Sequence, residues 1–338
     1  MKQTMILTGD VNLLKVSDPT VPFARVADVL RKADLVFGNL ECCLSDPPAG
    51  YSLDQEGFYA GPHAGEALKI GGFHGVGCAN NVTYGAEAIR ASLARLEDLG
   101  IGYTGAGLNR KAARRPLIME RGGVCFGFLQ YTSVFWPTGQ AAGERSPGVA
   151  TIKAYTAYQP RVANRAGVPP IILTSADDQD LNEFQNDILS LRKQVDVVVS
   201  SHHWGQAQDV LQYQQQIAHV AVEAGADIVM GHGVHYPLAV EIYKGKPIFY
   251  GLGCFSFHTG HRAKVQGDWV GLMVRVILEN RKVVKVTCSP VRHNENNETI
   301  IRPAKEEQKT MQRLAELSNK FNTKLDIGDD EVVAWKID

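Results

Sequence analysis

Two histidines that stand three positions apart carry the strongest chemical signal in this sequence. His232 and His235 follow the short apolar run Ile228 to Met230, and a glycine separates that run from the first histidine. Such a run predicts a buried strand. Polar side chains directly after a buried strand are typical of a site at the carboxyl end of a sheet. Because imidazole is a common ligand of divalent metals, the spacing points to a metal site as readily as to a structural loop.

The same arrangement recurs after four other predicted strands. The polar side chains at those strand ends are Asp10, Glu41, the pair Asn80 and Asn81, and the pair His202 and His203. Taken singly, an Asp or Asn in such a place often only forms a turn. Glu41 differs, because it stands beside an apolar run, where a carboxylate needs a partner or a metal ion. Successive side chains of an extended segment point to opposite sides, so we expect one of the two adjacent histidines to face the site.

Together these side chains predict a centre for two metal ions. The expected ligands are Asp10, Glu41, Asn81, His203, His232 and His235. A mixed set of oxygen and nitrogen ligands suits zinc, manganese or iron. Six ligands exceed what one catalytic zinc uses, but they fit two divalent ions about 3.5–4 Å apart. We expect a carboxylate to bridge the ions, and Glu41 is the candidate.

Composition narrows the class of protein. The chain has 338 residues, of which 44% are hydrophobic, and its formal net charge is -1. A balanced charge predicts no nucleic-acid partner and no membrane partner. The cysteines show no metal-binding or disulfide spacing, so we interpret them as reduced core thiols. The first residues run straight into a predicted strand, and no apolar stretch reaches transmembrane length. We therefore expect a soluble, cytoplasmic protein.

The order of predicted elements favours a mixed α/β fold. Strands and helices alternate up to about residue 99, and hairpins are expected at 117–131, 238–250 and 270–286. Parallel units followed by hairpins predict a mixed sheet. We expect a single domain over residues 1–338, with an irregular loop insertion at about 137–177. A charged amphipathic helix is expected in the C-terminal tail, at about 303–325.

The motifs at the strand ends resemble one known family. The matching pieces, which occur in order, are Gly9-Asp10, Asn39-Leu40-Glu41, Ala79-Asn80-Asn81, His203-Trp204-Gly205 and Gly231-His232-Gly233-Val234-His235. They are similar to the poly-γ-glutamate capsule-synthesis (CapA-type) branch of the calcineurin-like metallophosphoesterases. The resemblance implies a four-layer α/β/β/α sandwich with a dinuclear site in the loops at one edge.

Three positions depart from the family pattern. A His usually follows the two Asn, where it is the expected proton donor to a leaving group, and here that residue is Val82. A Glu common beyond the Trp-Gly pair is Ala207, and the Asn of a Leu-Gly-Asn-Phe motif is Cys254. The expected metal ligands are all present. Without the proton donor, phosphoester hydrolysis is less favoured.

The leading hypothesis is a dinuclear metal-dependent hydrolase. A metal-bound hydroxide would attack an amide, peptide-like or ester substrate, and the family's link to γ-glutamyl polymers favours an amide. We assign catalytic roles to His202, Asn80 and Asn39. Contacts with the substrate are expected from Arg161, Arg165, Trp204 and His258. The partner would be a small-molecule or peptide-like anionic substrate, and the sequence also allows a homo-oligomer.

Two other functions remain open at this point. The same metal centre could acidify a carbon next to a carbonyl, as in an isomerase or epimerase, which needs no proton donor at position 82. A non-catalytic module that binds an anionic polymer or peptide is the alternative from another class. It predicts little or no metal and a groove lined by residues such as Trp136 and Arg161.

Overall fold

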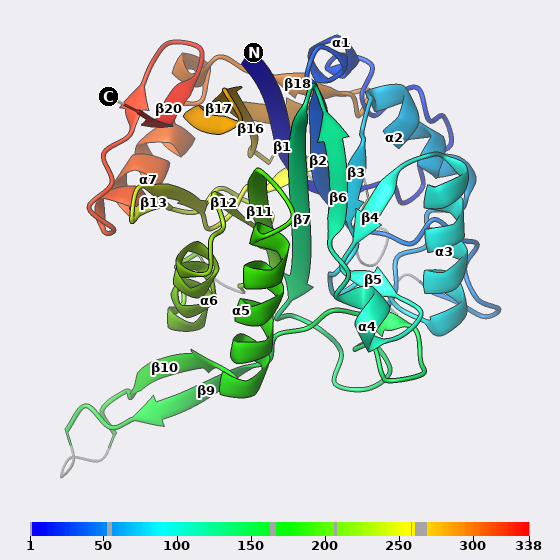
Figure 1. Ribbon diagram of the computed structural model, residues 1–338, viewed down its shortest axis with the longest axis horizontal. Helices are drawn as coiled ribbons and strands as arrows, with labels where there is room; N and C mark the ends of the chain where they lie inside the picture. The colour runs from blue at the N-terminus through cyan, green and yellow to red at the C-terminus, as the bar shows by residue number, and fades with distance from the viewer. Residues whose placement is uncertain are drawn as a thin grey trace.

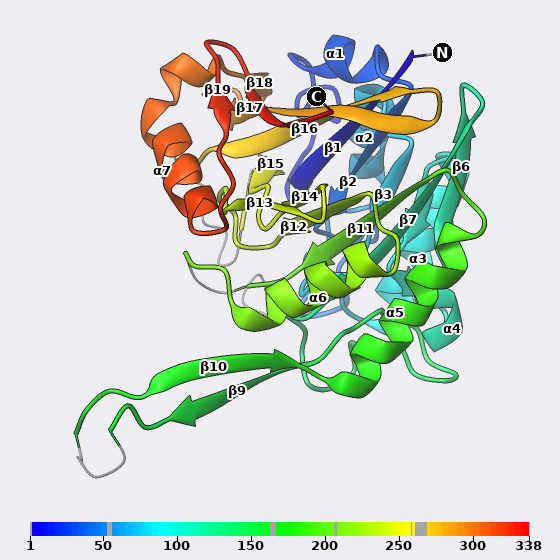
Figure 2. The same ribbon diagram turned by 60° about the vertical axis from the view of Figure 1, so that its left-hand side comes forward.

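The computed structural model describes residues 2–52, 56–162, 167–205, 208–257, 259–260 and 269–337. Arg165 and His258, both expected at the substrate, lie outside these ranges, as does Ala207. The described chain forms two large sheets with helices outside them, and a two-stranded ribbon projects from the body (Figures 1 and 2).

The first sheet combines a parallel half with an antiparallel half. Its main order is β19-β20-β17-β16-β1-β2-β3-β4, with β15 beside β1 and β18 beside β17. Strands β1 to β4 run parallel, whereas β16, β17 and β20 pair antiparallel. The bounds are β1 Lys2–Asn12, β2 Leu35–Leu40, β3 Gly75–Gly77, β4 Gly102–Thr104, β15 Cys254–Phe257, β16 Gly271–Glu279, β17 Lys282–His293, β18 Thr299–Ile301, β19 Asp326–Ile327 and β20 Val332–Lys336.

The second sheet has a parallel centre with antiparallel edges. Its order is β13-β14-β12-β11-β7-β6, in which β7, β11, β12 and β14 run parallel. The bounds are β6 Leu117–Arg121, β7 Val124–Thr132, β11 Val197–His203, β12 Ile228–His232, β13 Val240–Tyr243 and β14 Lys246–Phe249. A small separate pair joins β5 Ala106–Gly107 to β8 Gly148–Val149.

The two sheets share one apolar cluster. Met5 and Leu7 of β1 belong to this cluster together with Val197 of β11, whereas Ile6 belongs to the cluster on the helix side. This alternation is the period of two that a strand buried on both faces requires. The rings of Phe37 and Phe128 stack between the sheets, with centroids 4.4 Å apart.

The helices cover the outer faces of the sheets. Helices α1, α2 and α3 lie over the first sheet, and α5 and α6 lie over the second (Figure 1). The bounds are α1 Ala27–Arg31, α2 Glu66–Gly71, α3 Ala86–Asp98, α4 Arg110–Ala113, α5 Asp178–Arg192, α6 Gln212–Glu223 and α7 Gln308–Asn319. No helix in the described ranges is long and apolar enough to cross a membrane.

The prediction of a mixed α/β fold is confirmed, but the loop insertion is not irregular as expected. Within 137–177, strands β9 Ala154–Gln159 and β10 Ile171–Ala176 pair antiparallel as the projecting ribbon (Figure 2). Most side chains of β9 and several of β10 are exposed, so the sequence lacks the apolar alternation of a strand with one buried face. The tail contains the expected amphipathic helix as α7, with Met311 and Leu314 buried.

Candidate metal centre

The carboxyl ends of strands from both sheets bring predicted ligands together. Asp10 comes from β1, His232 ends β12, and His235 follows it. The His235 Nδ1 atom lies 3.1 Å from Asp10 Oδ2, and His232 Nδ1 lies 3.7 Å from Asp10 Oδ1. His203, which ends β11, has its Nδ1 3.2 Å from His232 Nδ1. Glu41, directly after β2, completes the group, with Oε1 3.9 Å from His235 Nε2.

These side chains form two overlapping triads. One triad is Asp10, His203 and His232, and the other is Asp10, His235 and Cys254. Within each triad the possible ligand atoms lie within 4.8 Å of one another. Asp10 is therefore the carboxylate common to both, whereas the sequence favoured Glu41 as the bridging group.

The loop after β12 reaches this geometry through unusual backbone conformations. His235 has φ +65°, in the left-handed region that side chains other than glycine seldom adopt. Gly233 has φ +100°, and a Cβ at this position would lie 2.8 Å from the His203 ring. Glycine is thus required where the loop passes the imidazole. Strain of this kind persists where the surrounding structure holds it, and it concentrates at functional sites.

Neighbouring polar side chains hold the ligands in place. Asn39 Nδ2 donates to Asp10 Oδ1 at 2.8 Å, and Gln130 Nε2 donates to Asn39 Oδ1 at 2.8 Å. Ser201 Oγ lies 2.9 Å from His232 Nε2. Gln130 Nε2 lies 3.2 Å from the same nitrogen, so two side chains, from β7 and β11, hold the plane of the His232 ring while its Nδ1 faces Asp10 and His203. A second interaction of this kind commonly orients a metal-binding imidazole.

Burial controls the charges in the centre. Burial raises the pKa of the Glu41 carboxyl well above its ordinary value, and the nearby charge of Asp10 adds to this effect. Burial also opposes ionisation of Asp10, but a hydrogen bond from His235 and the imidazole charges outweigh it, so the pKa of Asp10 is lowered. Burial lowers the pKa of His203 to about 4 and that of His232 well below its ordinary value. Neutral imidazoles keep the lone pairs that metal binding requires.

The residues present fit a pair of divalent cations. Glu41 Oε2 and Asn81 Oδ1 are buried and have no hydrogen-bond partner in the described part of the chain. A buried oxygen without a partner costs about 1–3 kcal/mol, and a cation would satisfy it. Positive charge would also stabilise two carboxylates that otherwise oppose each other's ionisation.

One of the three side chains expected to be catalytic lies in other surroundings. His202 occupies the opposite side of β11, where it stacks on Trp204 at 4.7 Å and contacts Phe184 at 5.3 Å between ring centroids. Alternation along β11 sends Ser201 and His203 to the centre and His202 into the helix-covered core.

The other two side chains expected to be catalytic, Asn39 and Asn80, lie beside the centre. Asn39 donates to Asp10. Asn80 is one step further away, because its Nδ2 donates to Asn39 Oδ1 at 3.4 Å and to Leu40 O at 2.7 Å, while its Oδ1 accepts from Thr83.

The residues expected at the substrate do not gather around the centre. Trp204 is 0% exposed, and its indole N–H donates to Tyr250 O at 2.9 Å, which makes it a core residue. Arg161 is exposed and follows the last residue of β9, a strand of the ribbon that projects from the body (Figures 1 and 2). Neither position supports the substrate contact that the sequence suggested.

Sequence reasoning missed three residues of the centre. Cys254, interpreted as a core thiol, belongs to a ligand triad. Gln130 and Ser201 come from β7 and β11 and contact Asn39 and His232. The position of Ser201 two residues before His203 was a signal that could have been used, since residues i and i+2 share one face of a strand. Cys254 could have been noticed because it follows Gly251-Leu252-Gly253 at another strand end.

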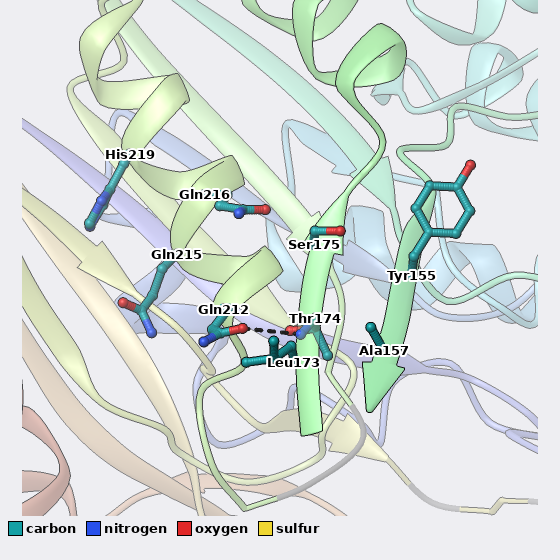
Figure 3. A pocket seen from close by; sticks show the side chains of 9 residues that line it. All are labelled: Tyr155, Ala157, Leu173, Thr174, Ser175, Gln212, Gln215, Gln216 and His219. Atoms are coloured by element: carbon teal, nitrogen blue, oxygen red, sulfur yellow. Dashed lines mark hydrogen bonds between the residues drawn. The ribbon is translucent and has the colours of Figure 1, made fainter. Parts of the chain in front are cut away.

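A separate groove lies between the ribbon and α6. Its volume is about 640 Å³, and Figure 3 shows its lining: Tyr155, Ala157, Leu173, Thr174, Ser175, Gln212, Gln215, Gln216 and His219. None of the ligand triads contributes to it. Within the described chain, the convergent donors and the buried Glu41 and Asn81 oxygens therefore mark the candidate metal centre more clearly than the size of this open groove marks a second site.

A solved structure shares the fold. The crystal structure of a hypothetical protein from Thermus thermophilus matches 86% of this chain and 100% of that chain, with a TM-score of 0.51 and 15% identity. The uncharacterized protein y4sH of Sinorhizobium fredii is 26% identical over 317 residues, covering 78% of this chain and 68% of that protein.

A relative from Bacillus anthracis, the capsule biosynthesis protein CapA, is 27% identical over 273 residues. The match covers 77% of this chain and 61% of that protein, so this chain spans less than two thirds of the relative's length. A family model described as bacterial capsule synthesis protein PGA_cap matches residues 3–259. That range contains both ligand triads, together with Glu41 and Asn81. The match extends over most of the chain, and the protein therefore belongs to the PGA_cap family of bacterial capsule synthesis proteins.

Proposed function

We propose that this protein is a hydrolase that uses two divalent metal ions to cleave an amide, peptide-like or ester bond. One observation carries the proposal: His203, His232, His235 and Cys254 converge on Asp10, while the buried Glu41 and Asn81 oxygens after β2 and β3 have no hydrogen-bond partner among the described residues. Zinc, manganese or iron would be held by Asp10, Glu41, Asn81, His203, His232 and His235. When bound, such ions polarise a substrate oxygen and make a water molecule acidic near neutral pH.

The chain's own residues would orient the reaction. Asn39 holds the Asp10 carboxylate in one rotamer, and Ser201 holds the His232 ring. His203 and His232 are fully buried, whereas the side chain of His235 is 41% exposed. A substrate would therefore approach past His235.

The family relationship suggests the class of substrate. The relatives' names connect them with capsule biosynthesis and with polyglutamine synthesis. For this chain we propose an anionic substrate with amide links between glutamyl units. Phosphoesters are less favoured, because Val82 is buried at the position where the family carries a proton donor. We also propose that the two sheets and their covering helices make up the α/β/β/α arrangement of calcineurin-like metallophosphoesterases.

The same observation at Val82 supports a second candidate. An isomerase or epimerase acting beside a carbonyl needs a polarised carbonyl and a base but no acid for a leaving group. Assaying a γ-glutamyl peptide for both release of amine and inversion of its stereocentres separates the two reactions.

Metal content of the purified protein tests the proposal first. We expect about two equivalents of zinc, manganese or iron per chain. His232→Ala should lose at least one equivalent together with hydrolysis of γ-glutamyl peptides. His63→Ala, which removes an exposed imidazole outside the centre, should keep both. A wild-type protein that stays free of metal after incubation with these ions would contradict the proposal.

The shared carboxylate can be identified in the same way. Asp10→Asn and Glu41→Gln keep the size of each side chain but remove its charge. Neutralising a carboxylate that both ions share should release both equivalents of metal, whereas neutralising the other carboxylate should release one. From the two triads we expect the larger loss for Asp10→Asn. Elemental analysis after dialysis against metal-free buffer gives the count.

A further inference from the structure

We propose that Cys254 is a thiolate ligand of the ion held by Asp10 and His235, so that this position selects zinc over manganese or magnesium. The inference rests on the proposed function, since it needs a metal in the centre.

The geometry places the sulfur among the other ligand atoms. Cys254 Sγ lies 3.7 Å from His235 Nδ1, and both lie within 4.8 Å of an Asp10 oxygen. The residue is 2% exposed, so bulk water does not compete for the sulfur. Among the described cysteines, Cys254 is the one that belongs to a triad of possible ligands.

The backbone holds Cys254 beside Asp10. Strand β15 runs parallel to β1, with Asp10 and Cys254 as register partners, and the Asp10 N–H donates to Gly253 O at 2.9 Å. Close packing fixes both sides of this segment. A Cβ on Gly9 would lie 1.9 Å from Gly253 O, and a Cβ on Gly271 would lie 1.8 Å from Cys254 O. The sulfur therefore has a defined position relative to the Asp10 carboxylate.

Glu41 gives independent support for a cation beside these residues. Its side chain is buried, and Oε2 has no hydrogen-bond partner in the described chain. Its Oε1 lies 3.9 Å from His235 Nε2, whereas Cys254 approaches the Nδ1 edge of the same ring, so Glu41 is not counted among the donors of this ion. Asp10, His235 and Cys254 offer one oxygen, one nitrogen and one sulfur, and three protein ligands with an open position match a catalytic zinc site.

A sulfur ligand changes which metal is preferred. Thiolate is a soft ligand that favours zinc, cobalt or cadmium, whereas manganese and magnesium prefer oxygen. On binding, a sulfur–metal bond forms and the thiol proton is released to solvent, so no oxidant or reductant is needed. Replacing the thiol by an amide oxygen should move the preference towards manganese.

Cobalt substitution of the purified full chain provides the test. Wild-type protein loaded with Co²⁺ should show thiolate-to-cobalt charge-transfer absorption in the near ultraviolet. Cys254→Ser and Cys254→Asn should bind cobalt but lose this absorption. Cys288→Ser, which removes a buried thiol from the cluster between the sheets, should retain it. In competition between zinc and manganese, Cys254→Asn should shift the preference towards manganese by about tenfold or more.

X-ray absorption of the zinc-loaded wild-type protein tests the ligand without any variant. We expect about one sulfur for every two zinc ions, at about 2.3 Å. Bound cobalt or zinc without a sulfur signal would overturn the role of Cys254 and leave the hydrolase proposal standing. A sulfur signal in a protein that cleaves no γ-glutamyl, ester or phosphoester substrate would support Cys254 as a ligand and overturn the hydrolase proposal. A protein that binds neither ion would overturn both.

Discussion

At the scale of single residues, the centre depends on side chains that are not ligands. Asn39 connects Asp10 with Gln130, and Gln130 reaches back to the backbone of Ala79. The network fixes one oxygen of Asp10 in place. A carboxylate held in advance loses less freedom when it binds an ion, so in the proposed metal centre these residues would strengthen affinity without touching the metal.

Asn39→Ala tests this positioning role. The change leaves Asp10 Oδ1 without its donor, so we expect metal affinity to fall about 10–100-fold. The free energy of unfolding should fall by about 1–3 kcal/mol. Asn109→Ala is a matched control, because the Asn109 side chain accepts from Ala112 N as the N-cap of α4. It should cost about 1 kcal/mol and leave affinity unchanged. Equal affinities for both variants, from chelator competition, would show that Asn39 has no part in the centre.

At the scale of elements, two sheets and the apolar cluster between them hold the centre. Strand β2 leads to Glu41 and strand β7 carries Gln130, and their rings Phe37 and Phe128 stack across the interface. The projecting ribbon of β9 and β10 differs, because its aromatic side chains face solvent. Tyr158 is 70% exposed, while Phe128 is 0% exposed.

Alanine substitution of these two aromatic residues separates the roles of the elements. Phe128→Ala should destabilise the protein by about 3–5 kcal/mol, because a cavity opens between the sheets. Tyr158→Ala should change stability by about 0.5 kcal/mol or less. Urea unfolding followed by circular dichroism measures both. A large loss for Tyr158→Ala would mean that the ribbon packs against a partner in solution.

At the scale of the whole molecule, we expect the buried histidines to make the stability of the protein without bound metal depend on pH in the acid range. Burial lowers the pKa of His202 to about 3 and that of His203 to about 4. In the unfolded chain these groups return to ordinary values near 6.5. Between the folded pKa values and pH 6.5, the unfolded state binds more protons than the folded state, so the free energy of unfolding rises with pH. The contribution is complete above about pH 6.5 and is lost as pH falls towards the folded pKa values.

His202→Phe tests the part of this dependence that comes from outside the centre. One buried histidine adds up to about 1.4 kcal/mol per pH unit to the slope of unfolding free energy against pH. The measurement uses protein treated with a chelator. Between pH 6 and pH 4, the slope of the unfolding free energy against pH should be smaller in the variant by the contribution of one histidine. Phe184→Leu, at the neighbouring ring, should lower stability but keep the wild-type slope. An unchanged slope in His202→Phe would show that His202 is not held neutral by burial.

The sequence by itself determined the buried strands of this protein and the polar residues that follow them. Short apolar runs followed by Asp10, Glu41, His203, His232 and His235 were enough to predict buried strands, the site at their ends and the mixed α/β class. These signals are local, because a buried strand and the residue after it lie within a few positions. The family resemblance rests on the same segments, and the family match confirms it.

The tertiary structure decided what depends on pairing between distant segments. Only the strand faces show that His203 reaches the centre while His202 lies in the core. Cys254 is far from Asp10 in sequence and becomes its neighbour through the pairing of β15 with β1. The ribbon was missed because exposed strands carry no apolar alternation. Contacts between residues distant in sequence depend on how the strands pair and pack, and neither residue spacing nor composition predicts them.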